Sequence, residues 1–202
     1  MVGEPLMSKT IEFYFDVGSP TAYLANKRLQ QLCDEYGASL DYRPVLLGGI
    51  FKAAGNMSPV AVPAKGKYMM EQDLPRFAVA YGAPLNFNPY FPINTLNLMR
   101  GAIASRSESY FQTYLNAVFD AVWVEGKDMG DVTVVQEVLN SAGLDADALL
   151  AMTKDPEVKA KLIEDTQAAV DRGLFGVPTI FIDQQMFFGQ DRMQFIESAL
   201  RD

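Results

Sequence analysis

A serine followed by a proline, Ser19-Pro20, stands between a short aromatic run and an amphipathic stretch. Its ordinary interpretation is the first turn of a helix, because serine caps free backbone N–H groups and proline is tolerated at the first helical position. The place also suits chemistry, since these N–H groups and the helix macrodipole favour negative charge. No general base lies nearby in the sequence to activate the hydroxyl. We therefore expect Ser19 to donate a hydrogen bond that holds another group's thiolate.

A second candidate is Gly176-Val177-Pro178-Thr179, directly before an apolar run. The ordinary interpretation is a proline that begins a strand. The functional alternative is a cis Pro178 that displays the N–H and C=O groups of Val177, so that an extended peptide can pair with them as an added strand. Both interpretations stay open from the sequence.

Two more segments carry side chains suited to a charged ligand. Gln190 and Asp191 precede the last predicted helix, where Asp191 is expected to be the N-cap. The pair could also bind the ammonium and carboxylate groups of a ligand. Lys52 and Lys65 lie in glycine-containing segments that we predict to be turns. Loop lysines are usually only solvated, but an anionic ligand of an acidic protein would need such cations.

The composition excludes several kinds of active site. The chain has no histidine and one cysteine, Cys33. A Ser-His-Asp triad, a Cys-His dyad, a histidine-ligated metal site and an internal disulfide are therefore impossible, and we expect no metal. Cys33 falls on the apolar stripe of the first predicted helix, so we interpret it as a buried structural residue. A single thiol also fits a reducing, cytoplasmic setting.

Net charge and hydropathy limit the kinds of partner that we expect the protein to bind. The 202 residues include 17 Lys and Arg against 25 Asp and Glu, a formal net charge of −8. This balance argues against nucleic-acid or anionic-membrane binding, which need clustered basic residues. The start of the sequence lacks a signal-peptide pattern, and no uncharged apolar stretch approaches the roughly 20 residues that span a bilayer.

The elements that must position these residues follow a recognisable order. Residues 11–16 and 39–46 are predicted strands, separated by a helix that starts at Ser19-Pro20 and ends at Gly37. Such a β-α-β unit implies a parallel pair. At the other end, residues 177–182 and 185–188 are predicted to form a hairpin before the last helix.

The middle of the chain shows helix signals only. Helices are predicted after Asn94, Ser107 and Asp145, and from Asp155-Pro156 to Gly173; Thr133 and Gln136 have the spacing of a capping box. Residues 83–93 are predicted to be an irregular connection. The sequence thus predicts an α/β, thioredoxin-like fold with a large all-helical insertion. Residues 8–50 and 155–202 form the thioredoxin-like domain, and 51–154 form the insertion.

Taken together, these segments resemble the glutathione-dependent branch of the DsbA-like thioredoxin superfamily, which contains kappa-class glutathione transferases and 2-hydroxychromene-2-carboxylate isomerases. The resemblance runs over nearly all of residues 9–201 and is carried by FYFDVGSPTAYLA, RPVLLGGIFKAAGN, VPAKGKYM, FPINTLNLMR, AVWVEGKDMGD and FGVPTIFIDQQMFFGQDRM. GIFKAAGN, the FPINT stretch and FFGQDR are more similar to the isomerases than to the transferases.

The resemblance assigns roles by position. Ser19 stands where related oxidoreductases have the first cysteine of CxxC, and in this branch it is the catalytic residue that holds the sulfur of glutathione. Ala22 stands at the second cysteine position, which removes dithiol chemistry. Thr21 departs from the family, which commonly has tyrosine there, and is expected to alter only the pocket wall. The other implied glutathione contacts are Asn56, Lys65, Val177, Pro178, Gln190 and Asp191.

The implied activity is a glutathione-dependent interconversion of 2-hydroxychromene-2-carboxylate and trans-o-hydroxybenzylidenepyruvate. Lys52 and Tyr90 are the implied contacts to the carboxylate and ring of this aromatic substrate. The family is commonly homodimeric. Two alternatives stay open: a kappa-class-like transferase or peroxidase that consumes glutathione, and a non-catalytic thioredoxin-fold module that binds peptides.

Overall fold

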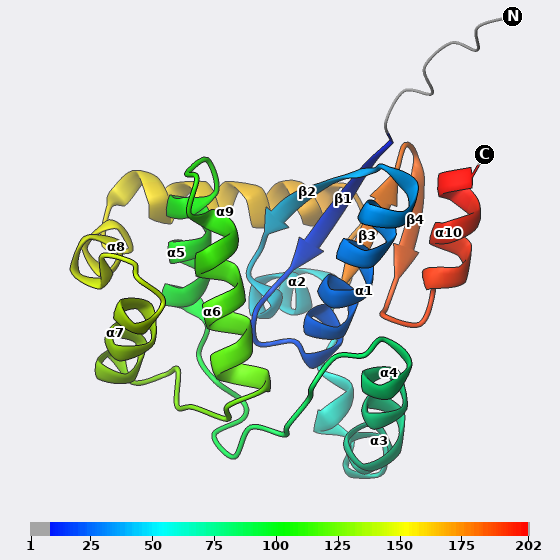
Figure 1. Cartoon of the computed structure of the whole chain (residues 1–202), viewed down its shortest axis with the longest axis horizontal. Coiled ribbons are helices and arrows are strands. Elements are labelled where there is room, and N and C mark those ends of the chain that lie inside the picture. The colour runs from blue at the N-terminus through cyan, green and yellow to red at the C-terminus, as the bar shows by residue number, and fades with distance from the viewer. Residues whose placement is uncertain (1–8, 202) are drawn as a thin grey trace, which may run out of the picture.

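The computed structural model describes residues 9–201, and its four strands form one mixed sheet in the order β2-β1-β3-β4 (Figure 1). β1 (Thr10–Phe15) pairs in parallel with β2 (Ser39–Pro44) and antiparallel with β3 (Thr179–Ile182). β4 (Gln185–Phe188) pairs antiparallel with β3 and forms an edge of the sheet. The β-α-β start and the β-β-α end confirm the thioredoxin-like order predicted from the sequence.

The sheet separates two hydrophobic cores, because successive side chains of a strand point to opposite faces. Phe13 and Phe15 are fully buried on one face, in a core shared with α1 and α10. Tyr14 and Phe181 lie in the smaller core of the other face, with residues of α2 and α9. The four helices that contribute to these cores on the two faces of the sheet are α1 (Pro20–Tyr36), α10 (Met193–Arg201), α2 (Leu47–Ala54) and α9 (Pro156–Asp171).

The remaining helices lie between α2 and α9 in the sequence and form two groups in space (Figure 1). One group stands beside the sheet, where α5 contacts α6, α8 and α9, and α7 packs against α6 and α8. The other group projects below the sheet and contacts the rest through α1 and α4. The bounds are α3 (Pro63–Tyr68), α4 (Leu74–Ala80), α5 (Leu96–Ser105), α6 (Phe111–Trp123), α7 (Val132–Ser141) and α8 (Ala146–Met152), with a 3-10 turn at Pro59–Ala61 and a π-helical turn at Met69–Asp73.

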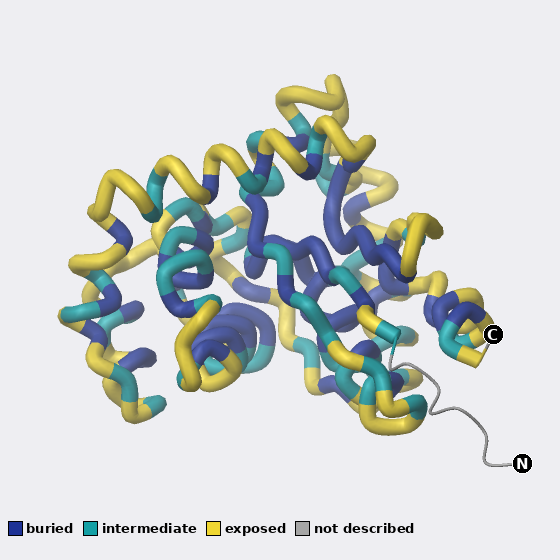
Figure 2. Tube along the Cα trace, turned by 90° about the horizontal axis from the view of Figure 1, so that it is seen from above, coloured by how far each residue is buried: buried dark blue, intermediate teal, exposed yellow. Residues whose placement is uncertain are grey.

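Burial follows this arrangement. Exposed residues line the outer side of the chain trace, and buried residues gather where the helices meet the sheet (Figure 2). The larger core is continuous from the sheet into the helices beside it, since Phe119 of α6 stacks near both Phe15 and Tyr23. The helical insertion and the sheet therefore share one core.

The structure corrects the prediction of glycine turns around Lys52 and Lys65. Gly48 and Gly49 lie inside α2, and Lys52 lies in its last turn. Lys65 lies inside α3. Two consecutive glycines disfavour a helix, and for this reason the sequence did not predict α2. The proposed domain boundary after residue 50 falls within this helix.

Other boundaries differ by a few residues. α7 is capped by the Asp131 side chain, which accepts the Thr133 N–H, so the capping box predicted at Thr133 is wrong. α6 begins at Phe111, four residues after the predicted start at Ser107. Residues 83–93 contain neither helix nor strand, as predicted.

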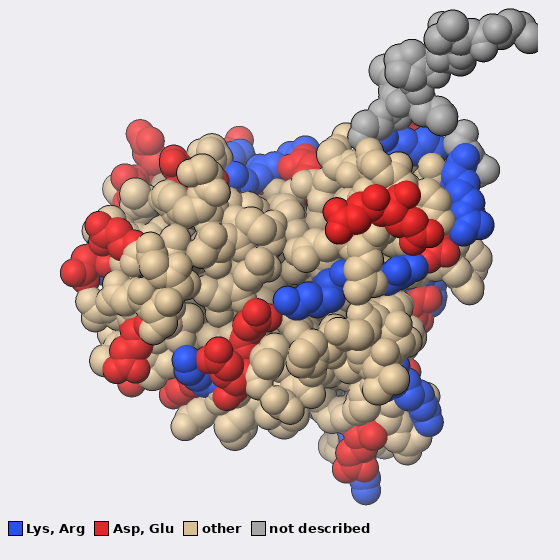
Figure 3. Space-filling view, in the orientation of Figure 1, with Lys and Arg blue, Asp and Glu red and all other residues tan. Residues whose placement is uncertain are grey.

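The outer surface shows no broad basic region on the face in Figure 3, where Lys and Arg side chains are interleaved with Asp and Glu. Within residues 9–201, no helix is both long and apolar enough to cross a membrane.

Close packing of α5 on α6 makes Gly101 sensitive to substitution. A Cβ atom at Gly101 would lie 2.2 Å from Oη of Tyr114, whose hydroxyl donates to the Leu98 carbonyl at 2.7 Å. We expect Gly101→Ala to lower the free energy of unfolding by about 1–3 kcal/mol, because the buried tyrosine must shift. Urea unfolding measures the change. The matched control is Gly48→Ala in α2, where nothing lies within 4 Å; it should be neutral or stabilising, and equal losses in both variants would contradict the packing explanation.

Candidate active site

The register of the sheet brings three predicted site segments to one end. Tyr14 near the end of β1 is paired with Thr179 at the start of β3, and Thr179 is paired with Phe188 at the end of β4. The Ser19 turn, the Val177-Pro178 segment and residues 189–192 extend directly beyond these pairs. The Gly189 N–H donates to the Pro178 carbonyl at 3.0 Å, which joins two of the segments.

Ser19 is the N-cap of α1, as predicted, and Pro20 is the first residue of the helix. The Ser19 side chain is 4% exposed, and its Oγ accepts the Ala22 N–H at 3.1 Å. A second hydrogen bond of 2.8 Å joins Ser19 Oγ to Thr21 Oγ1. The Thr21 N–H has no hydrogen-bond partner within residues 9–201. An unpaired donor and a buried hydroxyl thus occupy the positive end of a 17-residue helix.

A buried carboxylate that was not predicted as a site residue, that of Asp16, holds this turn. Asp16 is 2% exposed and accepts the N–H groups of Gly18 and Leu47, each at 2.9 Å, and a hydrogen bond from Thr95. Burial raises the pKa of Asp16, and the three hydrogen bonds lower it by less. An acidic residue at the end of a strand, three positions before Ser19, is the signal that could have identified it.

Side chains from the helical insertion fix the backbone of the same turn. The indole N–H of Trp123 donates to the Val17 carbonyl at 2.7 Å, and the Val17 N–H donates to Sδ of Met99 at 3.4 Å. A Cβ atom at Gly18 would lie 2.8 Å from Cγ2 of Thr95, so the turn and the start of α5 are in close contact. The insertion therefore sets the position of Ser19.

The Val177–Pro178 peptide bond is cis, which decides one question that the sequence left open. Val177 is buried, yet neither its N–H nor its C=O has a hydrogen-bond partner in the described part of the chain. Buried backbone groups are nearly always paired. These two unpaired groups lie at the same end of the sheet as the Ser19 turn, and they are the groups with which an extended ligand can pair.

Asn56, which follows the end of α2, contacts the segment just before Val177. Its amide nitrogen donates to the Phe175 carbonyl at 2.8 Å, and its Oδ1 accepts the Met57 N–H. The Phe175 ring in turn packs against that of Phe188 in a tilted arrangement, with ring centroids 4.5 Å apart. Asn56 therefore borders the approach to Val177.

Gln190 and Asp191 have different environments. Gln190 is 6% exposed, and its carbonyl accepts the hydroxyl of Tyr81 at 2.6 Å, whereas its side-chain amide has no partner in residues 9–201. Asp191 is exposed and forms an ion pair with Arg192. The prediction that Asp191 caps α10 is wrong, because Arg192 directly precedes that helix. The free amide of Gln190 is the better-placed group for a ligand.

Lys52, Lys65 and Tyr90 are exposed. No hydrogen bond or ion pair among the described residues joins their side chains to Ser19 or to one another. The contacts predicted for them, Lys65 to glutathione and Lys52 and Tyr90 to the substrate, therefore stay predictions.

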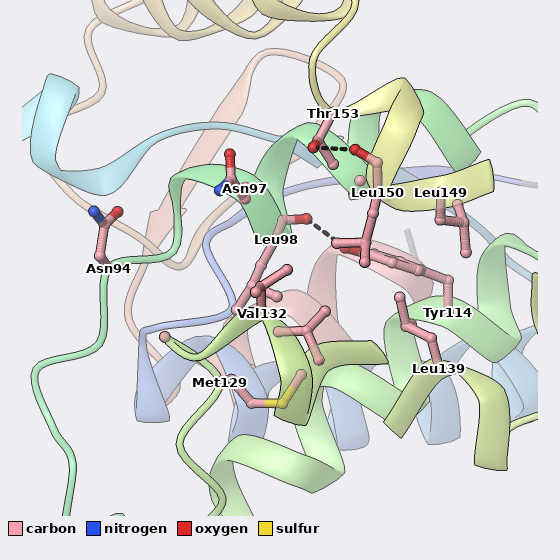
Figure 4. Close-up of a pocket in the computed structure, with 13 residues that line it drawn as sticks. Asn94, Asn97, Leu98, Tyr114, Met129, Val132, Leu139, Leu149, Leu150 and Thr153 are labelled. Atoms are coloured by element: carbon pink, nitrogen blue, oxygen red, sulfur yellow. Dashed lines mark hydrogen bonds between the residues drawn. The ribbon is translucent and has the colours of Figure 1, made fainter. Parts of the chain in front are cut away.

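A cavity of about 50 Å³ lies elsewhere, between α5, α6, α7 and α8 (Figure 4). Its lining includes Leu98, Tyr114 and Leu149, and none of the predicted site residues. The two hydrogen bonds drawn there, from Tyr114 to Leu98 and from Thr153 to Leu150, stay within the helical insertion.

A thioredoxin-like sheet with a helical insertion between α2 and α9 is the architecture of the DsbA-like class. The chain matches the DSBA-like thioredoxin domain over residues 10–201. It is 36% identical to a 2-hydroxychromene-2-carboxylate isomerase of Sphingobium xenophagum over 198 residues, which are 97% of this chain and 100% of that protein. A solved structure of a 2-hydroxychromene-2-carboxylate isomerase superposes with a TM-score of 0.86 at 34% identity, over 95% of this chain and 94% of the other. The chain belongs to this isomerase family.

A more distant relation extends to the transferases. The chain is 30% identical to glutathione S-transferase kappa 1 of Homo sapiens, over 96% of this chain and 92% of that protein. The resemblance inferred from the sequence motifs is thereby confirmed for both groups.

The buried Asp16 makes stability depend on pH in a defined direction. Its pKa in the folded protein lies above the ordinary 3.8, so the unfolded chain ionises first as pH rises. Wild-type stability relative to Asp16→Asn should therefore be greatest below the ordinary pKa of 3.8 and fall as pH rises through the folded pKa. Urea unfolding of both proteins at several pH values measures this difference, and parallel stability curves would contradict the assignment.

Cys33 is half-buried against the core, not fully buried as predicted, and its thiol should still be unreactive at neutral pH. Burial, with a smaller effect of Asp34, raises the pKa of the Cys33 thiol to about 11. Iodoacetamide should therefore modify the folded protein roughly 10²-fold more slowly than the urea-unfolded protein at about pH 7, because the thiolate fraction is lower. Mass spectrometry follows the modification. Equal rates in the two states would show that the thiol is available for chemistry.

Proposed function

We propose that the protein is a glutathione-dependent isomerase that interconverts 2-hydroxychromene-2-carboxylate and trans-o-hydroxybenzylidenepyruvate. Membership of the isomerase family supports the reaction. The observation that carries the use of glutathione is the buried Ser19 hydroxyl at the start of α1, at the same end of the sheet as the unpaired backbone of Val177 and the free amide of Gln190.

The donor groups suit glutathione, a tripeptide with a thiol and charged ends. Val177 offers one N–H and one C=O, which are the groups that pair with the cysteinyl backbone of an extended peptide. The Gln190 amide, with Asp191 beside it, can hold the γ-glutamyl end. Asn56, just after the end of α2, and Lys65, inside α3, complete the proposed set.

Ser19 supplies the electrostatic part of the mechanism. Its hydroxyl donates to the sulfur, and the Thr21 N–H and the dipole of α1 favour negative charge at the same place. These contacts lower the pKa of the bound thiol and raise the thiolate fraction at neutral pH. When bound, glutathione would supply a thiolate that adds to a conjugated carbon of the substrate; addition and ring opening would turn a double bond into a single bond that can rotate, and elimination of the thiol would restore the double bond and regenerate glutathione.

The chain cannot supply that nucleophile itself. It has no histidine to activate Ser19, and its only thiol, Cys33, is held protonated by burial. The proposed parts of Lys52 and Tyr90 are to bind the carboxylate and ring of the substrate. A lysine at that point would also stabilise the enolate-like charge that develops during the reaction.

A transferase or peroxidase that consumes glutathione is the second candidate, because kappa-class transferases are among the relatives. Product analysis separates the two. A stable conjugate or oxidised glutathione would identify the second candidate, whereas unchanged glutathione after many turnovers identifies an isomerase. A peptide-binding module without affinity for glutathione would be recognised by calorimetry.

The direct test is turnover of 2-hydroxychromene-2-carboxylate with and without glutathione, for wild type and Ser19→Ala. Omitting glutathione should abolish turnover. Ser19→Ala should lower kcat/KM by about 10- to 100-fold, because the thiol returns toward its ordinary pKa. Ser109→Ala, at an exposed serine near the start of α6, is the matched control and should retain wild-type turnover. Undiminished turnover without glutathione, or in Ser19→Ala, would contradict the proposal.

A further inference from the structure

The hydroxyl of Thr21 contacts the proposed catalytic serine. Thr21 Oγ1 lies 2.8 Å from Ser19 Oγ, and no other residue in 9–201 forms a hydrogen bond with this threonine side chain. Thr21 is half-buried. This contact was not foreseen from the sequence, where Thr21 was expected only to alter the pocket wall.

The direction of the hydrogen bond between Thr21 and Ser19 decides where the hydroxyl proton of Ser19 points. A serine hydroxyl has one proton to donate and two lone pairs to accept with. The Ala22 N–H occupies one lone pair of Ser19 Oγ. If Ser19 donated to Thr21, its only proton would be used inside the protein. If Thr21 donates instead, the second lone pair is filled and the Ser19 proton must point toward the ligand.

We propose that Thr21 is a positioning residue that donates its hydroxyl proton to Ser19 Oγ, so that the proton of Ser19 is directed to the sulfur of glutathione. The inference rests on the proposed function. A thiolate has no proton to give, so Ser19 must donate to it, and Thr21 is the one side-chain donor within reach of Ser19 in the described structure. The resulting chain of hydrogen bonds runs from Thr21 to Ser19 to the sulfur, and each bond polarises the next.

The experiment measures the pKa of the glutathione thiol when it is bound to the protein, from the ultraviolet absorbance of the thiolate across a pH series. Thr21→Val removes the hydroxyl but keeps the branched shape. We expect it to raise the thiol pKa by about 0.5–1 unit, which corresponds to the loss of one hydrogen bond. The acid limb of the kcat/KM profile should move by the same amount. Thr21→Ser keeps the hydroxyl and should keep the wild-type pKa.

Two controls separate this effect from altered folding. Thr113→Val places the same substitution at an exposed position of α6 and should leave the thiol pKa unchanged. Thr21→Ala also lacks the hydroxyl but favours the helix, so it replaces Thr21→Val if valine destabilises α1. Circular dichroism checks the helix in every variant.

The outcomes distinguish this inference from the function on which it rests. A raised thiol pKa in Ser19→Ala but a wild-type pKa in Thr21→Val and Thr21→Ala would overturn the role of Thr21 alone. An equal shift in Thr21→Ser would also overturn it, since the hydroxyl would not be the cause. Failure of wild type to bind glutathione, or an unshifted pKa in Ser19→Ala, would overturn the proposed function and this inference with it.

Discussion

The carboxylate of Asp16 joins the segments that place Ser19. It accepts hydrogen bonds from its own turn at Gly18, from the start of α2 at Leu47 and from Thr95 just before α5. A buried acidic group without such donors would cost several kcal/mol, so each of the three segments must keep its position for the group to be tolerated. The turn that presents Ser19 is consequently defined by contacts from three parts of the sequence, and not by its own residues alone.

The helical insertion takes part in this arrangement and is not merely attached to the sheet. Trp123 and Met99 bind the two backbone groups of Val17, and Tyr81 binds the carbonyl of Gln190. The thioredoxin-like part supplies the strand ends and the helix dipole, while the insertion fixes their backbone. The geometry of the Ser19 turn therefore depends on both parts of the chain.

The sequence predicted those features of the fold that depend on interactions between residues close together in the chain. The order of the strands and helices, the cap at Ser19 and the hairpin of the last two strands follow from periodicity, capping preference and turn residues. It did not predict α2, because Gly48 and Gly49 disfavour a helix locally and the stabilising contacts come from elsewhere. The first N–H of that helix is bound by Asp16, and Ile50 is fully buried in the second core. The bond between Thr21 and Ser19 was also missed, since it depends on rotamers that spacing alone does not define.

Trp123 is the only tryptophan of the chain and is 1% exposed. Its indole N–H is bonded to the Val17 carbonyl, two residues before Ser19. Indole fluorescence responds to the polarity and hydrogen bonding around the ring, and here all of that emission originates from one place beside the Ser19 turn. The protein thus carries an intrinsic optical reporter of any movement of this turn, and no dye needs to be attached to follow it in solution.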